Sequence, residues 1–372
     1  MRITRTTAVS AIALAGTLAL SACGSDNNSG GTGGAASGSA SVSAADCGSG
    51  TLNAEGSTAQ LKAIQQAISL YQAACDNKVT INYSGTGSGA GVKQFTAKQV
   101  QFGGSDSALK TVAVAGASVT ELDAATAACG SPALDIPLAA GAIGAAYHLE
   151  GVDKLNLDSA TLAKIYTGKI TKWNDAAIGA TNSGVTLPDK DIKVFFRSDE
   201  SGTTENLAKY LHATAPDVWT FDPAKAWKGT GEGKKGSSEI AKSVVGTDGS
   251  IGYMEVAFAT EAKLKVASIG GLAPEGDALA KGVAGGKIAA KDGDVRITFD
   301  YTKPAEGAYP IPIVTYELVC SKYADATVGK TVKSFLGFWA KDATQQAIAP
   351  LGYVPLPAEL KTAVDAAIAG IS

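Results

Sequence analysis

A strand followed by a glycine-rich turn most constrains the fold of this chain. The β-branched run at residues 79–83 leads into Ser84-Gly85-Thr86-Gly87-Ser88-Gly89-Ala90-Gly91, then into a short helical segment and a second strand that ends at Asp106. A strand, a glycine-rich turn and a helix start present free backbone N–H groups and the positive end of a helix dipole. The pattern therefore predicts an anion site, with Ser88 at the helix start and Asp106 beside it.

The same local pattern occurs three times. A strand ends in small hydroxyl or glycine residues and a helix begins at Gly56-Ser57-Thr58, at Gly87-Ser88-Gly89 and at Ser201-Gly202-Thr203. In a parallel α/β sheet such strand ends lie on one side, where ligands bind, and each helix start supplies free N–H donors. One such turn is more often only a capped helix, but three of them predict an oxyanion held in a cleft.

Two charged residues accompany these turns. Arg197 precedes the third turn, and its guanidinium can bind two oxygens of a tetrahedral anion. The alternative is an ion pair with Asp199 or Glu200. Asp106 would repel a fully deprotonated anion, so it favours a ligand that carries a proton, as phosphate does at neutral pH and sulfate does not. The alternative for Asp106 is a helix N-cap.

The whole chain has the composition of a globular α/β protein with room for two lobes. Its 372 residues are 45% hydrophobic, and its formal net charge is −3. The sequence has no basic block beyond Lys234-Lys235, so we expect no nucleic-acid partner.

Apolar periodicity and turn residues predict the order of the elements. The initial β-α-β-α-β order predicts a parallel sheet with right-handed crossovers, and residues 229–238 are expected to form a loop. Strands are expected at residues 51–54, 79–83, 100–103, 132–148, 192–196 and 313–320. Helices are expected at residues 59–75, 92–97, 158–180, 204–212, 324–343 and 357–369.

The first 22 residues are predicted to be a secretory signal outside the fold. Arg2 and Arg5 precede an apolar run at residues 8–20, and the segment ends in Leu20-Ser21-Ala22-Cys23. This ending resembles the lipobox of bacterial lipoproteins, in which the cysteine receives a lipid and becomes the new N-terminus. The alternative is an ordinary signal that is cleaved near Ala22.

The segment after this signal is predicted to be a flexible tether. Residues 23–46 are almost all small or polar and cannot bury enough apolar area to become ordered. We therefore expect a protein anchored through lipid on Cys23 to the extracytoplasmic face of the cell membrane.

Cysteine usage agrees with export. Besides Cys23, the chain has four cysteines, which allow three pairings. Cys47 precedes the first strand and Cys75 ends the helix that returns from it, so both should lie at the same edge of the sheet. This favours Cys47–Cys75 and leaves Cys129–Cys320; the alternative is four unpaired buried thiols. Since CxxC spacing is absent, a zinc or redox site has little support, and we expect no metal. We also expect no cofactor.

These motifs together resemble the substrate-binding lipoproteins of the bacterial phosphate-specific (Pst) ABC transporters. They appear in the family's order from about Thr51 to the C-terminus. The segments that carry the resemblance are residues 56–58, 85–94, 102–106, 165–170, 197–203, 251–253 and 351–357.

The resemblance implies a fold, a function and a set of binding residues. The fold would be the two-lobed, type II periplasmic-binding-protein fold, with a mostly parallel sheet flanked by helices in each lobe and a ligand cleft at the hinge. Lobe I would comprise residues 47–145 and 308–372, and lobe II residues 146–307. The function would be capture of inorganic phosphate and its delivery to the permease subunits of the ABC transporter, by a monomer and without catalysis. The phosphate-binding residues would be Thr58, Ala59, Ser88 and Asp106 from lobe I, and Arg197, Ser201, Gly202 and Thr203 from lobe II.

Two positions depart from the family pattern. An aromatic residue often follows the threonine in the family, whereas here it is Ala59; the backbone N–H contact survives this change, but packing by a ring does not. Glu200 replaces a glycine of the family's Asp-Gly-Ser-Gly-Thr motif. Its carboxylate would weaken binding or pair with Arg197, unless it points to solvent.

Other functions have weaker support. The pattern G-x-G-x-x-A at residues 85–90, with Asp106 downstream, also fits a dinucleotide-dependent enzyme, but the spacing to the acid is loose. The sequence lacks the G-x-S-x-G motif of a serine hydrolase, and His148 and His212 are its only histidines that could act as a base. The nearer alternative is a binding protein for sulfate, molybdate or a small organic phosphate; Asp106 argues against the first two.

Overall fold

The computed structural model describes residues 46–113 and 116–372 of the chain. The predicted signal at residues 1–22, the lipid attachment at Cys23 and all but the last residue of the predicted tether lie outside the described residues. No helix within the described ranges is long and apolar enough to cross a membrane.

The first β-α-β-α-β segment forms a parallel group of strands, as predicted. β1 (Gly50–Gly56) lies between β2 (Val79–Gly85) and β3 (Phe102–Ser105) and is parallel to both. The connecting helices are α1 (Leu61–Ala74) and α2 (Ser88–Thr96). Buried residues recur at helical spacing along α1, which packs one apolar stripe against the sheet.

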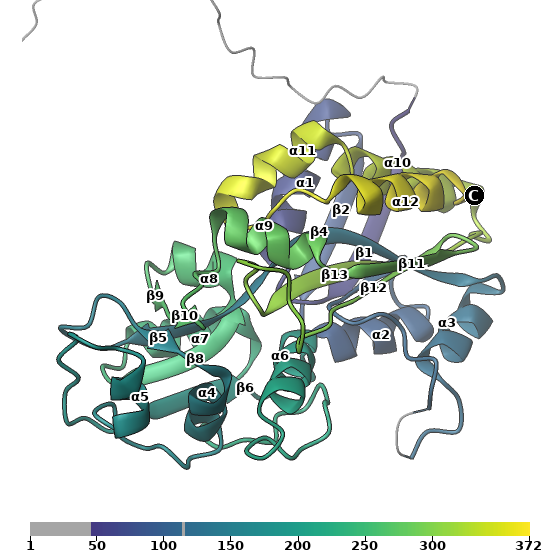
Figure 1. The fold of residues 1–372 in the computed structure, drawn as a ribbon. Coiled ribbons are helices and arrows are strands. Elements are labelled where there is room, and N and C mark those ends of the chain that lie inside the picture. The colour runs from purple at the N-terminus through teal and green to yellow at the C-terminus, as the bar shows by residue number, and fades with distance from the viewer. Residues whose placement is uncertain (1–45, 114–115) are drawn as a thin grey trace, which may run out of the picture. The chain divides into compact units, whose positions relative to one another are not determined.

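A single long strand connects two groups of strands (Figure 1). The first half of β4 (Ala133–His148) pairs with β13 (Pro312–Cys320), and its second half pairs with β8 (Ser250–Glu255). Both pairings are antiparallel, whereas β6 (Lys193–Arg197) is parallel to β8. Every residue of β4 except the last is buried, and small apolar residues suit a strand that is covered on both faces.

The described residues contain one large sheet and two small ones. The strand order of the large sheet is β2-β1-β3-β13-β4-β8-β6-β7, and β9 also pairs with β4. Two-stranded sheets are formed by β10 with β5 and by β11 with β12. The remaining strands are β5 (Asn156–Leu157), β7 (Glu232–Lys234), β9 (Lys265–Val266), β10 (Ser268–Ile269), β11 (Lys287–Lys291) and β12 (Asp294–Thr298).

Helices cover both faces of the first strand group. In Figure 1, α10, α11 and α12 lie on one face of this group, and α2 and α3 lie on the other. In the second group, α7 and α8 contact β8. The remaining helices are α3 (Glu121–Cys129), α4 (Ser159–Tyr166), α5 (Ala176–Ala180), α6 (Gly202–Thr214), α7 (Gly236–Val245), α8 (Val256–Glu261), α9 (Gly276–Ala284), α10 (Ala326–Trp339), α11 (Asp342–Ile348), the 3₁₀ helix η1 (Ala349–Leu351) and α12 (Ala358–Ala369).

The helix predicted at residues 158–180 is wrong as a single element. It consists of α4 and α5, because Gly168 takes a left-handed conformation, with φ of 71°, just after α4 ends. The non-helical segment that follows buries Ile170 and Trp173. Burial of Ile170 and Trp173 therefore decides the conformation of this segment, in place of the helical spacing of its apolar residues.

Two further predicted boundaries also change. The loop predicted at residues 229–238 contains β7, which pairs in parallel with β6 and places Glu232 opposite Phe195. Its residues have a low intrinsic preference for strands, so it is the pairing with β6 that makes this segment a strand. The helix predicted at residues 324–343 ends at Trp339, and α11 begins after a short break.

Two disulfides are present, and they are the pairs favoured by the sequence. Cys47–Cys75 ties the segment before β1 to the end of α1, with Cα atoms 5.7 Å apart. Cys129–Cys320 ties the end of α3 to the end of β13, with Cα atoms 5.4 Å apart. The second pair is 191 residues apart in sequence, so it removes more freedom from the unfolded chain than the first.

Candidate functional site

Glycines at the carboxyl ends of the first strands allow the site to form. Gly56 ends β1 directly opposite Gly85 on β2 and Gly104 on β3. Gly56 has a φ of 148°, and a Cβ there would lie 2.1 Å from the Gly104 carbonyl oxygen. A Cβ at Gly91 of α2 would lie 2.5 Å from the same oxygen. The lack of side chains therefore lets the turn after β1 and the start of α2 approach one point.

Asp106 lies at this point, directly after β3, and its carboxylate accepts four hydroxyl hydrogen bonds. Oδ1 accepts from Ser57 and, at 2.8 Å, from Thr315 Oγ1. Oδ2 accepts from Ser88 Oγ at 3.3 Å and from Thr203 Oγ1 at 3.2 Å. The side chain is only 3% exposed. Asp106 therefore gathers hydroxyl groups from four separate segments of the chain.

The environment of Asp106 has opposing effects on its charge. Burial raises the pKa of Asp106 above its usual value, while hydroxyl hydrogen bonds and the charge of Arg197 oppose this rise. These donors stabilise the carboxylate form, which cannot donate a hydrogen bond; an O–H of a ligand would take the place of one of the hydroxyl donors.

Ser88 begins α2, as predicted, and contacts both strand groups. Its Oγ accepts from the backbone N–H groups of Asp106, at 3.1 Å, and of Gly202, at 3.2 Å. Because Gly202 begins α6, the starts of two helices face each other here. The positive ends of both helix dipoles therefore point to one location.

The third predicted turn brings only part of its residues to Asp106. Thr203 donates to the Asp106 carboxylate, as described above. Ser201 has a different role, because it is the N-cap of α6 and its Oγ accepts from the Thr204 N–H at 3.2 Å. In this structure the Ser201 hydroxyl stabilises the helix end.

Arg197 is buried at the end of β6 between an aspartate and a serine. Its Nε donates to Asp199 Oδ1 at 2.8 Å, and its Nη2 donates to Asp199 Oδ2. Its Nη1 donates to Ser237 Oγ at 3.1 Å, and Ser237 Oγ also hydrogen-bonds to Thr58 Oγ1 at 3.0 Å. The ion pair that the sequence left as an alternative is therefore present, and Arg197 reaches the Thr58 turn through Ser237.

In the first predicted turn, Gly56-Ser57-Thr58, backbone N–H groups donate to acceptors near Asp106. The Ser57 N–H donates to the Gly104 carbonyl oxygen at 2.8 Å. The Ala59 N–H donates to Ser57 Oγ at 3.0 Å, the same hydroxyl that donates to Asp106. The backbone donor expected at Ala59 therefore lies next to the Asp106 cluster.

Two of the hydroxyl residues that sequence reasoning missed had a local signal. Ser57 is adjacent to the predicted Thr58. Ser237 follows Lys235-Gly236 at the start of α7, which repeats the glycine and hydroxyl pattern of the other helix starts. The prediction of a loop at residues 229–238 concealed this fourth helix start.

Thr315 had no such signal. It lies in the middle of β13, next to a shift in register: Thr315 lies opposite Ala139 and Tyr316 opposite Pro137, so that Leu138 of β4 is left unpaired as a β-bulge. Proline cannot donate to the strand ladder, and a bulge at such a position re-aims the neighbouring side chain. The orientation of Thr315 towards Asp106 therefore depends on pairing with a distant strand.

Glu200, the departure from the family motif, has its own partner. Its Oε2 lies 2.6 Å from Lys93 Nζ on α2, and both side chains are more than half exposed, at 51% and 72%. The Glu200 carbonyl oxygen accepts from the Gly89 N–H at 3.0 Å. The added carboxylate therefore pairs with Lys93 and not with Arg197.

Comparisons with known proteins show the family of this chain. The model of the PBP superfamily domain matches residues 41–343. Phosphate-binding protein PstS 3 of Mycobacterium tuberculosis (strain ATCC 25618 / H37Rv) is 41% identical to this chain over 382 aligned positions, which cover 100% of both chains. The chain belongs to this family of phosphate-binding proteins. PstS 2 of the same strain is 38% identical over 381 positions, again 100% of both chains.

The family fold is also seen among solved structures. The phosphate-binding protein from Stenotrophomonas maltophilia matches with a TM-score of 0.63 and 21% identity, over 86% of this chain and 94% of that chain. The two-lobed, type II fold predicted from the sequence is therefore confirmed.

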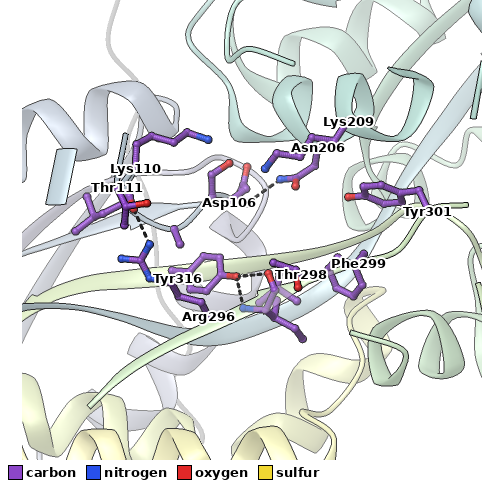
Figure 2. Close-up of a pocket in the computed structure, with 15 residues that line it drawn as sticks. Asp106, Lys110, Thr111, Asn206, Lys209, Arg296, Thr298, Phe299, Tyr301 and Tyr316 are labelled. Atoms are coloured by element: carbon purple, nitrogen blue, oxygen red, sulfur yellow. Dashed lines mark hydrogen bonds between the residues drawn. The ribbon is translucent and has the colours of Figure 1, made fainter. Parts of the chain in front are cut away.

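In this member of the family, a cavity of about 320 Å³ borders Asp106 (Figure 2). Figure 2 shows Lys110, Lys209 and Arg296 around it, and Asn206 of α6 donating to the Asp106 carbonyl oxygen, at 2.7 Å. No group of three or more histidine, cysteine or acidic side chains within residues 46–113 and 116–372 could hold a metal ion.

The cations at this cavity already have acidic partners. Lys110 and Lys209 both contact Glu205, the second at 3.0 Å. Arg296 contacts Asp294 at 2.7 Å. We assign the candidate anion site to the hydroxyl cluster and not to this cavity, because the starts of α2 and α6 face each other at the cluster.

Replacing Glu205 by glutamine should change the acid sensitivity of the fold. Burial raises the pKa of Glu205, but the charges of Lys209 and Lys110 outweigh burial and lower the pKa from 4.5 to about 2. Because the folded-state pKa is the lower one, the stabilisation is complete above pH 4.5 and is lost as the pH falls towards 2. Over this range, wild type should lose on the order of 3 kcal/mol more unfolding free energy than E205Q.

Urea unfolding across this pH range measures the effect. E239Q is the matched control, because Glu239 is 55% exposed and lies 4.0 Å from its lysine partner. It should follow wild type. Parallel pH profiles for wild type and E205Q would contradict the ion-pair account.

Proposed function

We propose that this chain captures inorganic phosphate on the extracytoplasmic side of the membrane and delivers it to an ABC importer. The observation that carries the proposal is the buried Asp106 carboxylate, surrounded by hydroxyl donors and acted on by the charge of Arg197. The relatives that match the whole chain are named phosphate-binding proteins. No catalytic step belongs to this function.

Phosphate suits this mixture of groups better than sulfate does. Arg197, the hydroxyl groups and the helix-start N–H groups complement negatively charged oxygens. Asp106 can only accept, so it requires an O–H on the ligand, which phosphate has at neutral pH and sulfate lacks. A site whose buried polar group is left unpaired by the wrong ligand discriminates by about 10⁴-fold or more.

Capture would use both lobes by hinged closure. Contacts between the two sides, such as Ser88 with Gly202 and Lys93 with Glu200, support this motion. We propose lobe I as residues 47–145 and 308–372, and lobe II as residues 146–307. Phosphate would be bound by Thr58, Ala59, Ser88 and Asp106 from lobe I and by Arg197, Ser201, Gly202 and Thr203 from lobe II.

The proposed location follows from the N-terminal sequence. A lipid on Cys23 and the tether at residues 24–46 would keep the monomeric binding domain close to the membrane. There the closed form would dock on the permease subunits of the importer and release phosphate to them.

Calorimetric titration of the purified chain with phosphate and with sulfate tests the function. We expect tight phosphate binding and a sulfate affinity that is lower by about 10⁴-fold or more. Molybdate and a small phosphate monoester serve as further competitors and should bind more weakly than phosphate. A chain that does not bind phosphate would contradict the function, and equal affinities for phosphate and sulfate would contradict the role of Asp106.

A further inference from the structure

The turn that contains Thr58 is fixed from behind by two tyrosines. Tyr83 of β2 donates its hydroxyl hydrogen to the Ser57 carbonyl oxygen at 2.7 Å. Tyr353, which follows η1, donates to the Ala59 carbonyl oxygen at 2.6 Å. Phenol groups from distant parts of the chain therefore fix both ends of this three-residue turn.

The direction of the second hydrogen bond constrains the group behind it. A phenol has one hydrogen, and Tyr353 gives it to Ala59, so the Tyr353 oxygen can only accept from its other neighbour. The carboxyl group of Glu255, at the end of β8, lies close to the Tyr353 ring, because a Cβ at Gly141 would be 2.9 Å from Glu255 Oε1 and 3.6 Å from Tyr353 Cδ1. An ionised carboxylate also only accepts. A hydrogen bond from Glu255 to the Tyr353 oxygen therefore needs a proton on Glu255.

Glu255 has an oxygen that is suited to carry this proton. Its side chain is 0% exposed, and its Oε2 accepts from the Ala257 N–H at 3.0 Å at the start of α8. As an acceptor, its Oε1 has no donor among the described residues. A proton on Glu255 turns this unsatisfied acceptor into a donor.

A second buried glutamate lies behind Tyr83. Gln60 Nε2 donates to the Tyr83 hydroxyl oxygen at 3.0 Å. Glu317 of β13 lies opposite Gly104 of β3, and a Cβ at Gly104 would be 2.5 Å from Gln60 Nε2. Glu317 is 0% exposed. Neither Glu317 oxygen, nor Gln60 Oε1, has a donor within residues 46–113 and 116–372. A proton on Glu317 supplies the donor that this group of acceptors lacks.

The surrounding charge also favours neutral acids. Burial raises the pKa of Glu255 and of Glu317 well above the usual range, and the negative charge of Asp106 raises both further. If Glu255 and Glu317 are neutral, Asp106 is the one negatively charged group among these three carboxyl groups. Asp106 is the one that faces the hydroxyl donors of the candidate site.

We propose that Glu255 and Glu317 are neutral carboxylic acids that position the turn for phosphate. Glu255 acts through Tyr353, and Glu317 acts through Gln60 and Tyr83. They are positioning residues, because each acts on the turn through other side chains. The positioning role rests on the proposed phosphate contacts of this turn.

Infrared spectroscopy of the purified chain at neutral pH tests the protonation. A neutral carboxylic acid has a C=O stretching band that differs from the bands of a carboxylate and a carboxamide. E255Q and E317Q should each remove part of this band from the wild-type spectrum. E205Q is the matched control, because lysines keep the Glu205 carboxyl ionised, and it should leave the band unchanged. A band that neither E255Q nor E317Q alters would overturn the proposal.

Phosphate titration tests the positioning. Y83F and Y353F each leave one carbonyl of the turn without its donor and should weaken phosphate binding by about 10-fold. Y323F is the matched control, because Tyr323 donates to the Gln101 carbonyl oxygen at 2.9 Å, ahead of β3. It should bind phosphate as wild type does. Wild-type affinity in both Y83F and Y353F would show that the turn does not need these donors.

Substitutions at Glu255 and Glu317 distinguish the effect of a hydrogen-bond donor from the effect of side-chain volume. In E255Q and E317Q the amide N–H can donate as the carboxylic acid does, so both should keep wild-type affinity. E255M and E317M fill similar space without a donor and should bind about 10-fold more weakly. Equal affinities for the glutamine and methionine variants would overturn the positioning role. If wild type does not bind phosphate, the proposed function fails instead, and the infrared result still decides the protonation.

Discussion

Replacing Asp106 by asparagine should reduce the preference for phosphate over sulfate from about 10⁴-fold to about 100-fold or less. Phosphate loses a charged acceptor for its proton, which weakens its binding by about 100-fold. Sulfate gains, because an amide can donate to an unprotonated oxygen and a carboxylate cannot. Paired calorimetric titrations of D106N with the two anions measure the change in this ratio.

Asp135 offers a matched control for this substitution. It is a fully buried aspartate on β4, and burial together with the negative Asp294 raises the pKa of its carboxyl group. It lies at Arg296 and not in the hydroxyl cluster. D135N should keep the wild-type ratio of affinities. An unchanged ratio in D106N would mean that Asp106 does not select the ligand.

Replacing Arg197 by alanine should weaken phosphate binding by about 100-fold or more. The substitution removes the guanidinium donors that reach the Thr58 turn through Ser237. It also leaves Asp199, whose side chain is 9% exposed, as an unpaired negative charge near the ligand. Calorimetric titration gives the affinity, and thermal unfolding of the same sample reports the cost to stability.

Two further variants separate these effects. In the double variant R197A/D199A the unpaired charge is gone, so binding should recover in part but remain about 10-fold weaker than wild type. R296A removes another arginine that pairs with aspartates, at 2.7 Å from Asp294, and should leave phosphate affinity unchanged. Wild-type binding by R197A would exclude Arg197 from the site.

The features that could be predicted from the sequence are those that are encoded locally. A helix start needs only a strand end, a glycine and a hydroxyl within a few residues, so Ser88 and Gly202 could be placed at opposing helix starts. The order of the motifs along the chain then gave the family and its fold. The cysteine pairing followed in the same way, from which strand and helix ends share an edge.

The groups that could not be predicted depend on contacts between distant segments. Thr315 reaches Asp106 over a sequence separation of 209 residues, through a bulge that pairing with β4 creates. Glu255 and Glu317 occur in strands whose other residues are buried, and only the assembled network behind the first turn reveals their hydrogen-bonding needs. The break after α4 was missed because Trp173 is buried from a non-helical segment, and the helical spacing of apolar residues does not predict such a segment.

The position of β13 has a consequence for the order of assembly. β13 lies between β3 and β4, yet it is synthesised roughly 200 residues after β3. Until then β3 and the first half of β4 each lack a neighbour, and Cys129 lacks Cys320. Contacts between such distant segments form slowly, and unpaired strand edges can bind wrong partners. The middle of the sheet is therefore closed late, by a strand that lies near the end of the chain.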